Sequence, residues 1–164
     1  ALGEKITRGH ASALGAVSGA VAGLVAITPA AGFSGVGGAI VLGAVSGVVC
    51  LWAVVNLKPM LKYDDSLDVF GIHGVGGIVG ALGTAIVAAP AFGGYPLGEA
   101  ADYAIGGQFM IQLTAVAIAV VWSGVVALVA MLIVKAIFGG ARVPDSAESD
   151  GLDLSTHGER AYNN

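Results

Sequence analysis

The sequence predicts an all-α protein, a polytopic transmembrane helical bundle of about four spans. Of its 164 residues, 56% are hydrophobic and 11% are charged, whereas soluble domains carry about 25% charged residues. Three long stretches carry no Lys, Arg, Asp or Glu, namely 11–57, 69–98 and 103–134. A membrane-spanning helix needs about 20 mainly apolar residues. The first stretch therefore has room for two spans, and each of the others has room for one.

Proline, glycine and charged residues mark the ends of the spans. Pro29 stops the first helix, because proline lacks a backbone N–H and its ring clashes with the preceding turn. The charged segment 58–66 separates the second span from the third, and Asp68 is a candidate N-cap of the third. Pro90 ends the third span and Gly139 ends the fourth. We expect spans at about 11–28, 36–57, 69–89 and 107–138, within a transmembrane segment over 1–140 that is followed by a polar tail over 141–164.

The basic residues predict how the bundle is oriented. Four spans place the N-terminus, the 58–66 segment and the tail on one side of the membrane, whereas the 90–106 connection on the other side carries only Glu99 and Asp102 as charged residues. Cytoplasmic loops are enriched in Lys and Arg, so we expect both ends of this segment to be cytoplasmic. All the basic residues fall on that side: Lys5, Arg8, Lys58, Lys62, Lys135, Arg142 and Arg160.

Small residues repeat within the first three spans. Glycines recur every fourth residue over 15–23, 43–47 and 76–80, and such glycines let helix backbones approach closely in lipid. The fourth span is rich in large apolar residues and has only Gly124 in its body, so we expect it to be a long helix with more surface toward lipid. Cys50, the single cysteine, is expected to be a small packing residue and excludes an intrachain disulfide.

His73 is the most informative residue for function, because it lies inside a charge-free span. Ionisable groups within a membrane are costly, and they usually face protein or a water-filled path. On a regular α-helix, His73 shares one face with Val69, Gly76, Gly77 and Gly80. We therefore expect it on the small-residue stripe that faces other helices. Two interpretations remain open: a neutral histidine bonded to a neighbouring helix, and a group on a transport pathway.

The other polar residues near the spans each have a structural and a functional interpretation. Asp65 and Asp68 either cap the third span, which the positive end of the helix dipole favours, or form a mildly anionic pore mouth. The hydroxyls of Ser18 and Thr28 usually bond back to their own helix in such positions. The sequence shows no nucleophile–base pair, phosphate-binding loop, metal cluster or nucleic-acid patch. It therefore favours a membrane protein that is not an enzyme and needs no cofactor.

Four segments resemble, in the same order, motifs of the Amt branch of the ammonium transporter family (Amt/Mep/Rh). Residues 18–32, SGAVAGLVAITPAAG, are similar to the eighth helix and its exit, and residues 65–77, DSLDVFGIHGVGG, to the signature of the tenth helix. Residues 122–124, WSG, resemble part of the eleventh helix, and residues 151–159, GLDLSTHGE, resemble the cytoplasmic tail motif. The resemblance covers nearly the whole chain.

This resemblance implies an eleven-helix, homotrimeric ammonium transporter of the cell membrane, whose first ten helices form an inverted repeat. The chain would supply helices eight to eleven and the tail, and its opening at Ala1 is what we expect of a piece of a longer protein. In the family, two histidines meet in a narrow hydrophobic pore. His73 matches the one on helix ten, whereas the partner on helix five, and most of the outer gate, belong to the part absent here.

The resemblance also implies residue roles. His73 would pass ammonia and relay a proton, while Val69, Asp68, Ser18 and Thr28 would line the pore or its cytoplasmic mouth. The tail would dock at that mouth.

In the tail, Ser155 and Thr156 are candidate phosphorylation sites, and a PII-type signal protein is a family partner at this face. Two other readings stay open from the residues alone: an unrelated polytopic transporter, and a membrane assembly fragment that does not conduct.

Overall fold

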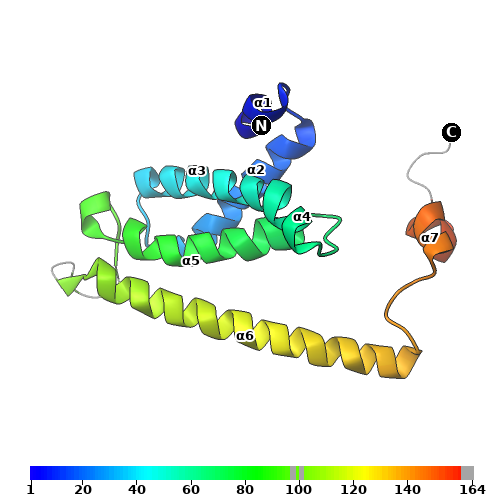
Figure 1. Ribbon diagram of the computed structural model, residues 1–164. Helices are drawn as coiled ribbons and strands as arrows, with labels where there is room; N and C mark the ends of the chain where they lie inside the picture. The colour runs from blue at the N-terminus through cyan, green and yellow to red at the C-terminus, as the bar shows by residue number, and fades with distance from the viewer. Residues whose placement is uncertain (97–98, 100–101, 160–164) are drawn as a thin grey trace. The chain divides into compact units, whose positions relative to one another are not determined.

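The computed structural model describes residues 1–96, 99 and 102–159, and all regular structure in this part of the chain is helical (Figure 1). Four helices there are long and apolar enough to cross a membrane: Ala13–Ala30, Val36–Leu61, Phe70–Val87 and Ile105–Phe138. The predicted all-α class with four spans is therefore confirmed. The chain divides into a unit over Ala1–Ile118 and a second unit over the remainder.

Within the first unit, α2 (Ala13–Ile27), α3 (Val36–Trp52) and α5 (Val75–Val87) pack against one another in pairs. Short helical turns join or extend them. These elements are α1 (Leu2–Arg8), the 3-10 turns Thr28–Ala30 and Pro90–Phe92, the π-helical turns Ala53–Leu57 and Phe70–Gly74, and α4 (Lys58–Leu61).

Small side chains and glycines form the contacts between these three helices. An ideal Cβ at Gly23 would lie 3.8 Å from Gly43 Cα, and one at Gly80 would lie 2.3 Å from the carbonyl oxygen of Ala26. Gly23, Gly43 and Gly80 thus let backbones approach as the spacing predicted. Gly19 and Gly47 belong to the same repeats, but nothing that the structure describes lies within 4 Å of a Cβ there.

The second span is longer than predicted, because α3 continues through the π-helical turn Ala53–Leu57 into α4 and the helix ends at Leu61. The sequence placed its end at Leu57, since a lysine and a proline follow. Proline normally interrupts a helix by clashing with the carbonyl four residues earlier. Here the Lys58 N–H bonds to the Ala53 carbonyl, five residues back, and this wider turn gives the ring of Pro59 room.

Loops meet at two opposite ends of the three-helix packing. At one end, the Tyr95 N–H donates to the Phe33 carbonyl at 2.7 Å, which joins the α2–α3 turn to the segment after α5. At the other end, the Lys58 ammonium donates to the Asp68 carboxylate at 2.8 Å. The helices therefore alternate in direction, as the four-span prediction requires.

The first ten residues were predicted only as a polar segment, but they include a short helix, α1. The Glu4 carboxylate accepts from the Ser12 N–H at 3.1 Å and from its hydroxyl at 3.0 Å. The Ser12 hydroxyl in turn accepts from the Gly15 N–H and caps α2. These bonds connect α1 to the start of the first span.

Helix α6 (Ile105–Phe138) has 34 residues, and none of them is buried by the part of the chain that the structure describes. The second unit contains the end of this helix, then α7 (Asp145–Asp150) and a π-helical turn over Asp153–His157. The Arg142 guanidinium pairs with the Glu148 carboxylate at 3.0 Å. Arg160, used above in the orientation argument, lies outside the described residues.

Candidate functional site

His73 lies in the π-helical turn Phe70–Gly74 that leads into α5. The Val75 N–H at its end bonds to both the Phe70 and the Ile72 carbonyl oxygens. Gly71 and Ile72 are buried, whereas Phe70 and His73 are exposed. The turn thus has an inner side against the bundle and an outer side that carries the imidazole.

The described part of the chain does not bury His73 with the small-residue stripe. On a regular helix it would lie with Gly76 and Gly80, and both of those are buried against α2 and α3. His73 is exposed instead, in a π-helical turn that contains about one more residue than a turn of α-helix. No described residue of the chain covers His73, and the small-residue stripe packs without it.

Asp65, rather than Asp68, caps this helix. Its two carboxylate oxygens accept from the Val69 N–H at 2.8 Å and from the Phe70 N–H at 2.9 Å. The predicted N-cap role of Asp68 is therefore wrong. Asp68 has a left-handed backbone, with φ of 56°, and its side chain turns toward Lys58. The sequence pattern favoured it because it directly precedes the apolar run, but a turn over 65–68 brings the earlier aspartate under the helix end.

Lys58, the first residue of α4, connects this helix to the segment that leads into the His73 turn. Its ammonium donates to the backbone carbonyl of Asp65 and to the carboxylate of Asp68, and both side chains of the ion pair are half-buried. The negative charge of Asp68 is therefore compensated within the chain. Sequence analysis missed this contact, because ten residues and a reversal of chain direction separate its partners.

The remaining predicted site residues lie at different levels of the bundle. Val69 is 53% exposed and directly precedes the π-helical turn. Ser18 is half-buried on α2, one turn before Ala22. The Thr28 hydroxyl donates to the Leu24 carbonyl of its own helix at 2.7 Å, at the end of α2 opposite the Lys58–Asp68 pair. The structure thus places Val69 and Asp68 beside the His73 turn, and Thr28 at the other end.

The tail candidates Ser155 and Thr156 are exposed in the π-helical turn over Asp153–His157.

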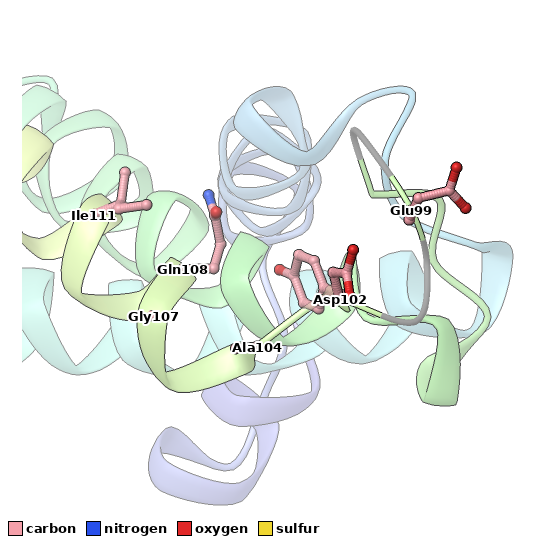
Figure 2. A pocket seen from close by; sticks show the side chains of 7 residues that line it. Glu99, Asp102, Ala104, Gly107, Gln108 and Ile111 are labelled. Atoms are coloured by element: carbon pink, nitrogen blue, oxygen red, sulfur yellow. The ribbon is translucent and has the colours of Figure 1, made fainter.

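A separate depression of about 440 Å³ lies at the start of α6 and contains none of the predicted site residues (Figure 2). Glu99 and Asp102 come from the preceding connection, while Gln108 and Ile111 project from the helix. Tyr103 also lines it, and its hydroxyl donates to the Ala85 carbonyl at 2.9 Å. Burial raises the pKa of the Tyr103 hydroxyl. This bond ties the start of α6 to the end of α5.

Beneath the His73 turn, two polar side chains of α3 are fully buried, Ser46 at 0% exposure and Cys50 at 2%. The Ser46 hydroxyl donates to the Ala22 carbonyl of α2, and the Cys50 thiol donates to the Ile72 carbonyl of the turn. Cys50 was predicted to be a small packing residue, and it does pack with Ala22 and Ile72. Its hydrogen bond has no signature in the sequence.

The chain is similar to known proteins along nearly its whole length. The model of the Ammonium Transporter Family matches residues 1–162. A putative ammonium transporter of Methanothermobacter thermautotrophicus is 45% identical over 97% of this chain and 39% of its own length. Ammonium transporters of Aquifex aeolicus and Bacillus subtilis are 46% and 43% identical, over 94% and 91% of this chain and 36% of their own lengths. The chain thus spans less than two fifths of these relatives.

Proposed function

The chain belongs to the Ammonium Transporter Family, and from this premise we propose that it takes part in moving ammonium across a membrane through a narrow hydrophobic pore. Its four long apolar helices make it a multi-pass membrane protein. The family is one of transporters rather than enzymes. Because the matched relatives are much longer, the pore is proposed for a protein of their length, in which this chain supplies the last four helices.

His73 is the residue proposed to carry the transport chemistry. Two observations support this role. His73 is exposed on the outer side of the π-helical turn, and it is the only titratable side chain of the span Phe70–Val87. An ionisable group in the membrane is costly against lipid. The inner side of the turn is already occupied by α2 and α3. An imidazole on the outer side therefore fits best against a conduit that other segments complete.

The chemistry follows from the two nitrogens of a neutral imidazole, one an acceptor and the other an N–H donor. A dry, narrow pore strongly disfavours a bare cation. Ammonium can give its proton to the acceptor nitrogen of His73, which leaves ammonia, and the N–H on the other side of the ring can pass a proton to a second imidazole outside this chain. Ammonia and the proton then cross separately, whereas potassium has no proton to give and is excluded.

The other parts of the proposal concern the surroundings of this residue. Val69, Asp68, Ser18 and Thr28 are proposed to line the pore or its cytoplasmic mouth. The position of Val69 and Asp68 beside the turn supports the role at the mouth. Thr28, at the other end of α2, fits only the pore wall.

We also propose a homotrimer in the cell membrane with both ends of this segment cytoplasmic, a transmembrane part over 1–140 and a tail over 141–164. The tail is proposed to dock at the cytoplasmic mouth, where a PII-type signal protein would bind. Within the tail, Ser155 and Thr156, both exposed, would be the phosphorylation sites. The concentration of basic residues in the segments assigned to the cytoplasm supports this orientation.

The decisive experiment measures ammonium and potassium currents for His73→Ala in the complete polypeptide at matched surface expression. Proton transfer by a positioned side chain contributes at least about 100-fold in many enzymes, so we expect the ammonium current to fall by a similar factor or its selectivity over potassium to be lost. His73→Glu should keep part of the conduction, because a carboxylate also accepts a proton. His10→Ala, outside the spans, is the matched control. Currents like wild type in His73→Ala would leave only the family assignment standing.

A further inference from the structure

A buried set of hydrogen bonds joins α2, α3 and the π-helical turn Phe70–Gly74. The Ser46 hydroxyl donates to the Ala22 carbonyl at 2.9 Å, and the Cys50 thiol donates to the Ile72 carbonyl at 3.7 Å. Ser46 Oγ and Cys50 Sγ are 3.6 Å apart, one helical turn from each other on α3. All of these residues are buried, and Ile72 directly precedes His73.

The direction of these bonds follows from the number of hydrogens. A hydroxyl and a thiol each carry a single hydrogen. The short contact from Ser46 to the Ala22 carbonyl uses the hydroxyl hydrogen, since a carbonyl can only accept. The thiol hydrogen is then left for the Ile72 carbonyl, which likewise can only accept. The two bonds therefore point away from α3 on opposite sides, one to α2 and one to the turn.

Close packing holds the same turn but does not fix its conformation. An ideal Cβ at Gly71 would lie 2.7 Å from Val54 Cγ2, and one at Gly76 would lie 3.2 Å from Cys50 Sγ. A side chain at position 71 would therefore require Val54 to shift, and the start of α5 admits only a very small residue at position 76. Apolar contacts of this kind have no direction. The thiol–carbonyl bond is the directional contact that selects where the Ile72 carbonyl points.

We propose that Cys50, whose thiol lies beside the Ser46 hydroxyl, is a positioning residue for His73. It holds the Ile72 carbonyl toward α3 and so keeps Phe70–Gly74 in its π-helical form. Conversion of this turn to a regular α-helix would remove its extra residue and so change the orientation of His73 relative to α5. The proposal deepens the transport role of His73 and rests on it only for its functional consequence, because the geometry of the turn can be measured separately.

The test replaces Cys50 by two side chains of the same shape. Cys50→Thr and Cys50→Val fill the same volume, but only threonine offers a hydrogen to the Ile72 carbonyl. The first readout is solid-state NMR of the complete polypeptide labelled with ¹⁵N-histidine, in which the His73 imidazole signals are assigned by their loss in His73→Ala. The second is the pH profile of the ammonium current. Thr84→Val is the control, because it removes a buried hydroxyl that bonds only to the Gly80 carbonyl within α5.

Loss of one hydrogen bond should lower the ratio of the π-helical to the α-helical form by about fivefold. In Cys50→Val we expect the His73 signals to shift or split and the pH profile to change, while Cys50→Thr and Thr84→Val stay close to wild type. Cys50→Ala also removes the thiol hydrogen and adds no branched side chain, so it should act like Cys50→Val and serves as the test if Cys50→Val does not give folded protein. Wild-type His73 signals in Cys50→Val, or in Cys50→Ala in that case, would overturn the proposal.

The two proposals fail in different ways. If the His73 signals follow the threonine–valine difference while His73→Ala conducts normally, the positioning role stands and the pore role of His73 falls. If His73→Ala abolishes ammonium current while Cys50→Val leaves the His73 signals unchanged, the pore role stands and the positioning role falls.

Discussion

Gly80→Ala adds a single methyl group where α5 approaches α2 most closely. An ideal Cβ at Gly80 would lie 2.3 Å from the Ala26 carbonyl oxygen and 2.7 Å from its Cα. These are backbone atoms, so no change of side-chain rotamer can relieve the contact. Gly77 lies almost one turn earlier on the same helix, and no described atom lies within 4 Å of a Cβ there. Gly77→Ala is therefore the matched control.

The size of the effect follows from that geometry. Ordinary van der Waals contact begins at about 3.4 Å, so the backbones at Gly80 and Ala26 must separate locally by about 1 Å. Overpacking of this kind costs about 1–3 kcal/mol. At Gly77, the methyl group meets no atom of the described residues, and replacing glycine by alanine within a helix is favourable by up to about 1 kcal/mol. Gly80→Ala should therefore lower the stability of the folded protein, whereas Gly77→Ala should leave it unchanged or raise it.

The assay heats the complete protein in detergent and follows the fraction that remains monodisperse. Gly80→Ala should lower the midpoint by about 2–10 °C, and Gly80→Leu should abolish the folded protein, whereas Gly77→Ala should leave the midpoint unchanged or raise it. Equal midpoints for the two alanine variants would refute the reasoning, because Gly80 would then not touch the α2 backbone.

Three further predictions test other parts of the structure. Asp65→Ala removes the carboxylate that caps the His73 helix and should destabilise the protein by about 1 kcal/mol in the same assay, while Asp64→Ala should have no measurable effect; equal midpoints would contradict the capping role. For orientation, Phe92→Cys should react with an impermeant thiol reagent added outside intact cells and Asp64→Cys should not, and the reverse pattern would overturn the proposed topology. Deleting 150–164 should change the rate of ammonium uptake at equal expression, and an unchanged rate would mean that the tail does not dock at the pore mouth.

Local physical chemistry explains why the sequence predicted the four spans well. Removing a charged side chain from water is costly wherever it lies, so charge-free stretches mark the membrane segments without knowledge of the packing. The start of the third span and the end of the fourth lie within one or two residues of the prediction. The end of the second span was predicted one turn too early. Whether the helix continues past Pro59 depends on whether the preceding turn can widen.

The sequence by itself determined the fold class, the four apolar helices, part of the glycine contacts among the first three and the resemblance to ammonium transporters, because each depends on residue type and spacing along the chain. Only the tertiary structure decided which way His73 faces. A π-helical turn and an α-helical turn differ by a single residue, and local propensity separates them only weakly. The choice is made by contacts across the bundle, where Gly71 packs on Val54 and the Cys50 thiol bonds to the Ile72 carbonyl. Those partners lie about 20 residues apart in the chain, so a pattern read along one helix cannot contain them.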